Sequence, residues 1–216
     1  MPRIKALLEE ESKPGLLARD VPGCRSNLDE SADDANHVFF KSDRLYLHHL
    51  LRINYTTYDV RRSQDVVNPG TSHRDIMMLA SDDDEENHHP FYYARILGIY
   101  HVNVIYTGAG MLDYNARRLD FLWVRWYRYA STQSVGWQDC KLDPLDFPPV
   151  SSEHAFGFVD PNDVLRACHI IPAFKTKKVH ADGISISRCA GDGADWRKYF
   201  ANRCGCPTCR RFLLIK

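Results

Sequence analysis

The fold is decided by residues 91–106, which read FYYARILGIYHVNVIY. In the second half of this stretch Tyr100, Val102 and Val104 alternate with polar residues. A period of two places successive side chains on opposite faces of a β-strand. Gly98 interrupts the run in its middle, and a glycine inside a strand favours a bulge or a bend. The stretch therefore predicts one long strand with a bulge or a bend at Gly98.

Further strand patterns lie on both sides of this segment. Residues 51–58 alternate, with Leu51, Ile53 and Tyr55 on one side, and predict a strand with one wet face. Residues 119–129 are almost continuously apolar and aromatic, which is typical of a strand covered on both faces. Shorter strands are predicted in the apolar runs 76–79 and 164–171 and around Trp137.

The turns between these strands complete the prediction. Asp160-Pro161 is typical of a short helical turn, because Asp caps free backbone N–H groups and Pro suits the first helical position. Residues 142–152 are rich in proline, and we expect them to be irregular. Many short strands without a long helical period predict a mainly β domain. We expect a small barrel or a strongly bent antiparallel sheet over residues 38–174.

The two ends of the chain differ in composition from this domain. Residues 1–37 are polar and contain many turn-forming residues, so we expect a disordered leader. Residues 175–195 carry Lys, Gly and Asp and have the composition of a linker. For residues 196–216 we expect a short α-helical, cysteine-containing tail.

Charge and cysteine content limit the class of protein. The chain has 28 Lys and Arg against 28 Asp and Glu, so contact with nucleic acid would need a local basic patch. It has no apolar run of about eighteen residues and no signal-peptide pattern, and we expect an intracellular protein without a membrane partner. Seven cysteines, an odd number, favour free thiols over a disulfide framework.

Three stretches carry a resemblance to a known family. They are NYTTYDVRRSQD at 54–65, HPFYYARILGIYHV at 89–102, and DFLWVRW at 120–126 with AFGFVDP at 155–161 and HIIPAF at 169–174. Together they resemble the C-terminal region of proteins encoded by Plavaka-type DNA transposons of mushroom-forming fungi. In that family a catalytic transposase region precedes the segment. The resemblance therefore implies a transposon-derived fragment or captured module without transposase activity.

A second resemblance is to the bromo-adjacent homology (BAH) domain, a chromatin-binding β-barrel. YARILGI at 93–99, VRWYR at 124–128 and VLRACHI at 164–170 look like three of its strands. The chain departs from the pattern at Tyr129, where a proline is expected. This resemblance implies a BAH-like barrel that docks on chromatin or on a protein partner.

Aromatic residues near strand ends are candidates for ligand binding. Aromatic faces attract cations, and several rings around a pocket can hold a methylated lysine. The candidates for such a cage are Tyr92, Trp126, Tyr129 and Trp137. The alternative is that these rings fill the core, since large rings contribute much of the burial in a small domain.

Basic and cysteine clusters give two further candidate sites. Arg61, Arg62, Arg117, Arg118 and the lysines at 175, 177 and 178 could contact phosphates, with ordinary surface charge as the alternative. Cys204, Cys206 and Cys209 could share a zinc ion, with Cys189 or His180 as a fourth ligand, or remain free thiols. We expect no other cofactor.

No catalytic residue is assigned, because the sequence has no nucleophile elbow, phosphate-binding loop, dinucleotide fingerprint or zinc-protease motif. We therefore expect a noncatalytic binding or accessory module, active in the nucleus, that docks on chromatin or a protein partner. Two alternatives stay open: a DNA-contacting accessory domain of a transposase, and an orphan fragment without present function.

Overall fold

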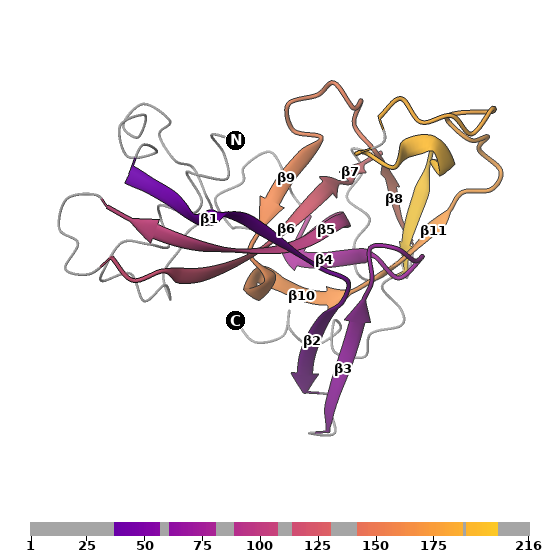
Figure 1. Ribbon diagram of the computed structural model, residues 1–216. Coiled ribbons are helices and arrows are strands. Elements are labelled where there is room, and N and C mark those ends of the chain that lie inside the picture. The colour runs from indigo at the N-terminus through magenta and orange to yellow at the C-terminus, as the bar shows by residue number, and fades with distance from the viewer. Residues whose placement is uncertain are drawn as a thin grey trace.

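The computed structural model describes residues 37–56, 61–80, 89–107, 114–130, 142–187 and 189–202, and these residues form a mainly β structure (Figure 1). The strands are β1 (Val38–His48), β2 (Leu51–Thr56), β3 (Arg62–Val67), β4 (Asp75–Leu79), β5 (Phe91–Tyr106), β6 (Arg117–Trp126), β7 (Arg128–Tyr129), β8 (Asp143–Asp146), β9 (Phe156–Val159), β10 (Val164–Ala167), β11 (His169–Pro172) and β12 (Tyr199–Asn202). Two 3-10 helices are η3 (Pro161–Asp163) and η4 (Asp192–Ala194). In this part of the chain no helix is long and apolar enough to cross a membrane.

The long strand β5 organises the main sheet, as its sequence predicts. The sheet has the order β10-β4-β5-β6-β9 with antiparallel pairing, and β1 joins it along the second half of β5. The first half of β5 pairs with β4 instead, from Asp75 opposite Arg95 to Leu79 opposite Phe91. The pairing of β5 with β6 shifts register between Ile96 and Gly98. The expected irregularity at Gly98 is thus confirmed as a register shift within one continuous strand.

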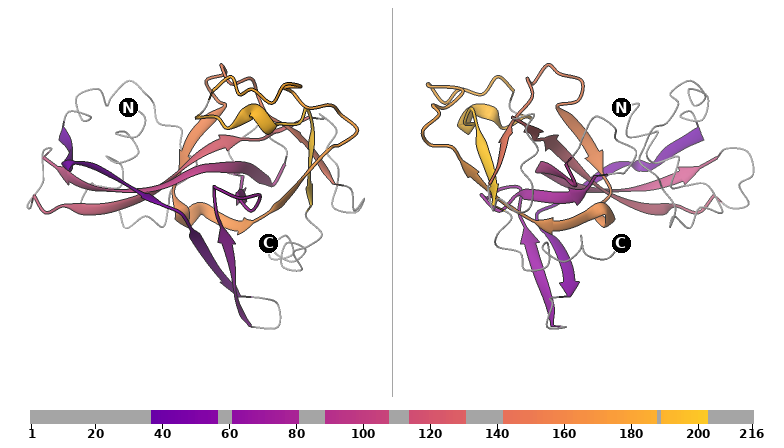
Figure 2. Two further views of the ribbon diagram at one scale, coloured as in Figure 1. Left: turned by 45° about the vertical axis from the view of Figure 1, so that its right-hand side comes forward. Right: turned by 180° about the vertical axis from the view of Figure 1, so that it is seen from behind.

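Two smaller sheets complete the fold. One has the order β11-β12-β8-β7, and the other is the two-stranded ribbon β2–β3, which projects from the body in both views of Figure 2. The main sheet and the four-stranded sheet pack on each other through a buried cluster that includes Phe91, Tyr93, Leu145 and Tyr199. Two other buried clusters complete the core. One lies around Ile96, beneath the ribbon, and the other lies beneath β1.

The bent antiparallel sheet of the sequence prediction is present, whereas a closed barrel is not found among the described strands. The main sheet is open because its edge strands β10 and β9 do not pair with each other. The short helical turn after Asp160 is confirmed as η3, where the Asp160 side chain accepts a hydrogen bond from the backbone N–H of Asn162 at 2.7 Å.

The helical tail expected from Trp196 is not found in its described part. Tyr199–Asn202 form β12, which pairs with β8 on one side and β11 on the other. Tyr199 and Ala201 are buried while Phe200 and Asn202 are half-buried, which is the period of a strand. The stretch 142–152 also contains a strand, β8, where irregular structure was predicted. Residues 203–216 and the leader 1–36 lie outside the described residues.

Candidate nucleic-acid interface

A pair of antiparallel segments, 173–179 and 195–198, builds a surface rich in basic residues. The backbone N–H of Ala173 donates to the Lys198 carbonyl at 2.9 Å, and that of Val179 donates to the Asp195 carbonyl at 2.9 Å. Lys178 and Trp196 form a β-bridge between them. These bonds hold side chains about twenty residues apart in sequence on one small surface.

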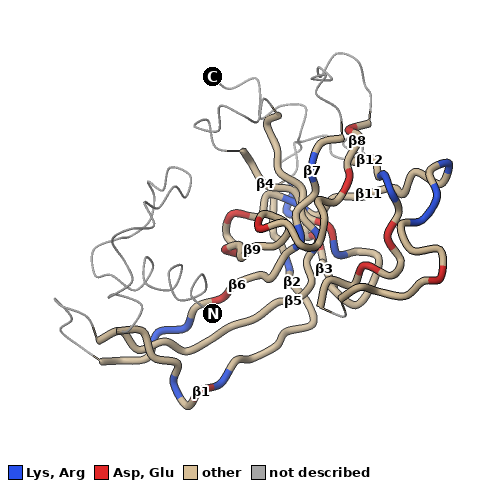
Figure 3. Tube along the Cα trace, turned by 90° about the horizontal axis from the view of Figure 1, so that it is seen from above, with Lys and Arg blue, Asp and Glu red and all other residues tan. Residues whose placement is uncertain are grey.

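Five cations gather on this surface, which we call the basic patch: Lys175, Lys177, Lys178, Arg197 and Lys198. All five side chains are exposed. Within the described part of the chain none of them is in a salt bridge or a side-chain hydrogen bond. In Figure 3 several stretches of Lys and Arg (blue) lie near β11 and β12, with Asp and Glu (red) between them. The patch therefore presents a local positive charge in a chain whose net charge is zero.

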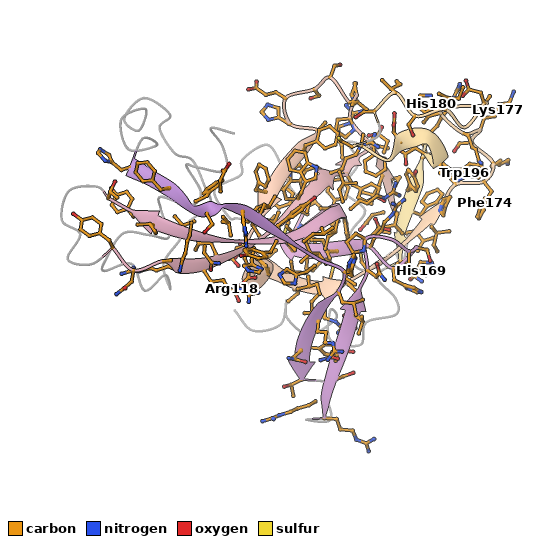
Figure 4. All side chains as sticks on the ribbon, viewed as in Figure 1. Arg118, His169, Phe174, Lys177, His180 and Trp196 are labelled. Carbon is orange, nitrogen blue, oxygen red and sulfur yellow. The ribbon has the colours of Figure 1, made fainter. Side chains whose placement is uncertain are left out.

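Two aromatic rings lie within the basic patch. The ring centroids of Phe174 and Trp196 are 5.1 Å apart with an edge-to-face angle of 82°. Phe174 is 70% exposed, which leaves most of its ring available to a ligand. Lys178 Nζ lies 5.8 Å from the Trp196 ring centroid. Figure 4 shows Phe174, Lys177 and Trp196 together at this end of the molecule.

The buried carboxylate of Asp195 anchors the patch to the core. It accepts hydrogen bonds from Arg95 Nη1 at 2.7 Å and from Arg125 Nη1 at 2.5 Å. The Tyr199 hydroxyl also donates to it at 3.1 Å and accepts the Trp196 backbone N–H at 2.8 Å. Arg95 comes from β5 and Arg125 from β6, so the segment that carries Trp196, Arg197 and Lys198 is fixed to the main sheet.

A second buried carboxylate, Asp75, completes this network. Its Oδ1 accepts from Arg95 Nε at 3.3 Å and from the Tyr127 hydroxyl at 3.0 Å. Burial raises the pKa of Asp75 above its usual range, although Arg95 and Tyr127 favour the charged form. Burial likewise raises the pKa of Tyr127. Two arginines and two aspartates thus balance one another inside the protein.

Aromatic rings do surround cations in this protein, but the cations are its own arginines. Arg125 Cζ lies 4.0 Å from the Phe147 ring centroid, and Arg95 Cζ lies 4.7 Å from the same centroid. The rings of Tyr127 and Tyr199 are also near Arg95, at 5.6 and 5.4 Å. This internal cage stabilises the network and is already filled.

The expected aromatic-cage residues are not brought to one place. Tyr92 and Trp126 are neighbours, with centroids 6.3 Å apart, and both pack against the cluster around Ile96. Tyr129 packs instead against the cluster between the two sheets, where its hydroxyl donates to the Phe91 carbonyl at 2.7 Å and contacts His89. Trp137 lies outside the described residues.

The predicted basic clusters have different surroundings. Arg61 and Arg62 lie, exposed, at the far end of the β2–β3 ribbon. Arg117 and Arg118 begin β6, and Arg118 is engaged by Asp120 at 2.7 Å. The lysines at 175, 177 and 178 are joined by two further cations, Arg197 and Lys198.

The proposed zinc ligands Cys204, Cys206 and Cys209 lie outside the described residues. Of the additional ligands considered, Cys189 is exposed, and His180 Nε2 lies 3.3 Å from an Asp192 carboxylate oxygen.

Sequence reasoning missed Phe174, Trp196, Arg197 and Lys198 as parts of a site. The signal available was the density of basic and aromatic residues in FKTKK at 174–178 and WRK at 196–198. Their pairing was not visible, because it depends on burial of Asp195. Comparison with known proteins adds nothing to this geometry: no protein family, curated protein or solved structure matches the chain.

Proposed function

We propose that this protein is a binding module that contacts nucleic acid through the basic patch. The observation that carries the proposal is the gathering of five exposed cations, unpaired among the described residues, around an aromatic pair in which Phe174 is exposed and Trp196 is half-buried. Lysine and arginine that neutralise phosphates release condensed counterions, and this release supplies most of the sequence-independent affinity for nucleic acid. Because the net charge of the chain is zero, attraction to nucleic acid has to come from a local basic surface such as this patch.

The aromatic pair favours single-stranded over duplex nucleic acid. Bases stack on exposed aromatic rings only when they are not stacked in a helix, and each such contact contributes about 1–3 kcal/mol. Phe174 offers an exposed ring face beside Lys175 and Lys177. Phosphate contact by the lysines and base stacking on Phe174 would then occur on adjacent nucleotides.

The resemblance to Plavaka-type proteins supports the same function, since a DNA-contacting accessory role suits a transposon-derived module that acts in the nucleus. The BAH resemblance supports docking on a chromatin peptide instead. That function needs several rings in one pocket, and Tyr92 and Trp126 lie apart from Tyr129 in the packing of the core. Nucleic-acid contact is therefore the better supported of the two.

Fluorescence anisotropy with the full chain tests the proposal. The probes are a labelled single strand of about 16 nucleotides and the matching duplex, each at 50 and 200 mM salt. If all five cations contact phosphates, the salt slope on single strands is about −3.5, so affinity falls roughly 100-fold over this range. We expect the single strand to bind more tightly than the duplex.

Variants that remove cations at two different places distinguish binding at the basic patch from an effect of overall charge. Lys175→Gln/Lys177→Gln/Lys178→Gln removes three cations and is expected to reduce the salt slope by about 2. Lys41→Gln/Arg44→Gln removes exposed cations of β1 and should leave the slope unchanged. Phe174→Ala should weaken single-strand binding about tenfold or more and spare the duplex. Binding of modified histone-tail peptides without salt-sensitive nucleic-acid binding would instead favour the chromatin-docking alternative.

A further inference from the structure

Away from the basic patch, three polar side chains converge from three adjacent strands. His101 lies in the central strand β5, directly opposite Asp120 of β6 and Tyr46 of β1. His48, at the end of β1, reaches across to His101, and its Nε2 lies 2.5 Å from His101 Nδ1. One nitrogen from each imidazole and one Asp120 carboxylate oxygen all lie within 4.8 Å of one another.

We propose that His48, His101 and Asp120 form a binding site for a divalent cation of the zinc class. Imidazole nitrogen and carboxylate oxygen are ligands that zinc prefers, at about 2.0–2.2 Å from the metal. Tetrahedral coordination at those distances separates ligand atoms by about 3.3 Å. Small side-chain rotations therefore bring all three atoms to the required spacing, because the His48 and His101 nitrogens need to separate and Asp120 needs to approach.

The surroundings favour a ligand set over a simple hydrogen-bonded pair. The Tyr46 ring stacks on His101, with centroids 4.5 Å apart and an interplanar angle of 4°, and fixes the orientation of the imidazole.

Two of the three proposed ligands, His48 and Asp120, line a cavity, which leaves room for a fourth ligand. A cavity of about 380 Å³ is lined by residues that include His48, Asp120, Arg52 and Asn162. Three protein ligands with an open fourth position are typical of metal sites that bind water or an anionic ligand. Because the cavity wall carries Arg52 and Arg118 but also the carboxylate of Asp160, that ligand is expected to be water.

Arg118 competes with a cation for Asp120. Its Nε and Nη2 donate to both carboxylate oxygens of Asp120, at 2.7 to 3.2 Å. Replacing Arg118 frees the carboxylate and removes a positive charge beside the site. Arg118→Gln should therefore raise cation affinity several-fold, whereas a purely structural His–His pair would not respond in this way.

Titration with Co²⁺ and Zn²⁺ alone tests the inference, in a Cys204→Ser/Cys206→Ser/Cys209→Ser background that removes the cysteine cluster of the tail. We expect one cobalt ion per chain with a visible absorption band and without the near-ultraviolet thiolate band. His101→Ala and His48→Ala should weaken binding 100-fold or more, and Asp120→Asn at least tenfold. His169→Ala, an exposed histidine of β11, serves as the matched control and should bind normally.

Circular dichroism establishes that each variant is folded, and His101→Gln replaces His101→Ala if the latter does not fold. Retention of the cobalt spectrum in both histidine variants would overturn the proposal, as would the absence of stoichiometric binding in the protein without the tail cysteine cluster. Loss of the spectrum in these variants, together with tighter binding by Arg118→Gln, would establish it. The result is independent of nucleic-acid contact, because these ligands lie outside the basic patch.

Discussion

At the scale of single residues, Asp195 connects the core to the basic patch. Its carboxylate is shared by Arg95 and Arg125, which are both buried. Removing one partner of a buried ion pair leaves an uncompensated charge, which lowers the free energy of unfolding by about 3–5 kcal/mol. Asp195→Ala should show a loss of this size in urea-induced unfolding, because two guanidinium groups lose their common partner.

The matched control is Asp146→Ala. Asp146 pairs with Arg128 at 3.0 Å, but the Arg128 side chain is 60% exposed, so solvent screens the pair. The expected loss of unfolding free energy is about 0–1 kcal/mol. Equal losses in the two variants would show that the Asp195 network does not depend on its burial.

At the scale of elements, β5 is the strand best predicted from sequence and β12 the least. The pattern of β5 is local, since its alternation and its glycine lie within sixteen residues. Tyr199–Asn202 have too few residues to display a period, and they become a strand only because β8 and β11 lie on either side. Short strands that form only because of partners far away in the sequence therefore cannot be predicted from the local sequence pattern.

The glycine at the bend of β5 is expected to be required for the stability of the protein. A Cβ on Gly98 would lie 2.6 Å from Tyr100 Cζ, closer than packing allows. The Tyr100 ring would have to leave Phe121, on which it stacks with centroids 5.6 Å apart. Gly98→Ala should lower the free energy of unfolding by about 1–3 kcal/mol, measured in urea.

A double-mutant cycle provides the check on this explanation. In a Tyr100→Ala background the clashing ring is absent, so the added methyl group should have little further effect. Additive losses from the two substitutions would mean that the strain at Gly98 arises from the backbone rather than from Tyr100.

At the scale of the whole molecule, the sequence predicted the general conditions for nucleic-acid contact but not the surface. Because positive and negative charges are equal in number, contact with nucleic acid requires a local basic patch. The lysines at 175, 177 and 178 were already candidates for phosphate contact. Arg197 and Lys198 could not be added to them, because only the folded chain brings 195–198 beside 173–179. Arg118, an equally reasonable candidate from sequence, is engaged by Asp120 in the fold.

The position of charge, rather than its total, should therefore govern nucleic-acid binding. Lys177→Glu/Lys178→Glu and Lys41→Glu/Arg44→Glu each turn two positive charges into two negative ones, so each takes the net charge from 0 to −4. A long-range field acting on the whole molecule would weaken binding equally in both variants. Phosphate contact at the basic patch predicts at least tenfold weaker binding in the first variant than in the second, since two contacts are lost and repulsion is added at the same place. Anisotropy titrations with one labelled single strand at fixed salt measure this ratio, and a ratio near one would assign the attraction to the overall field instead of the patch.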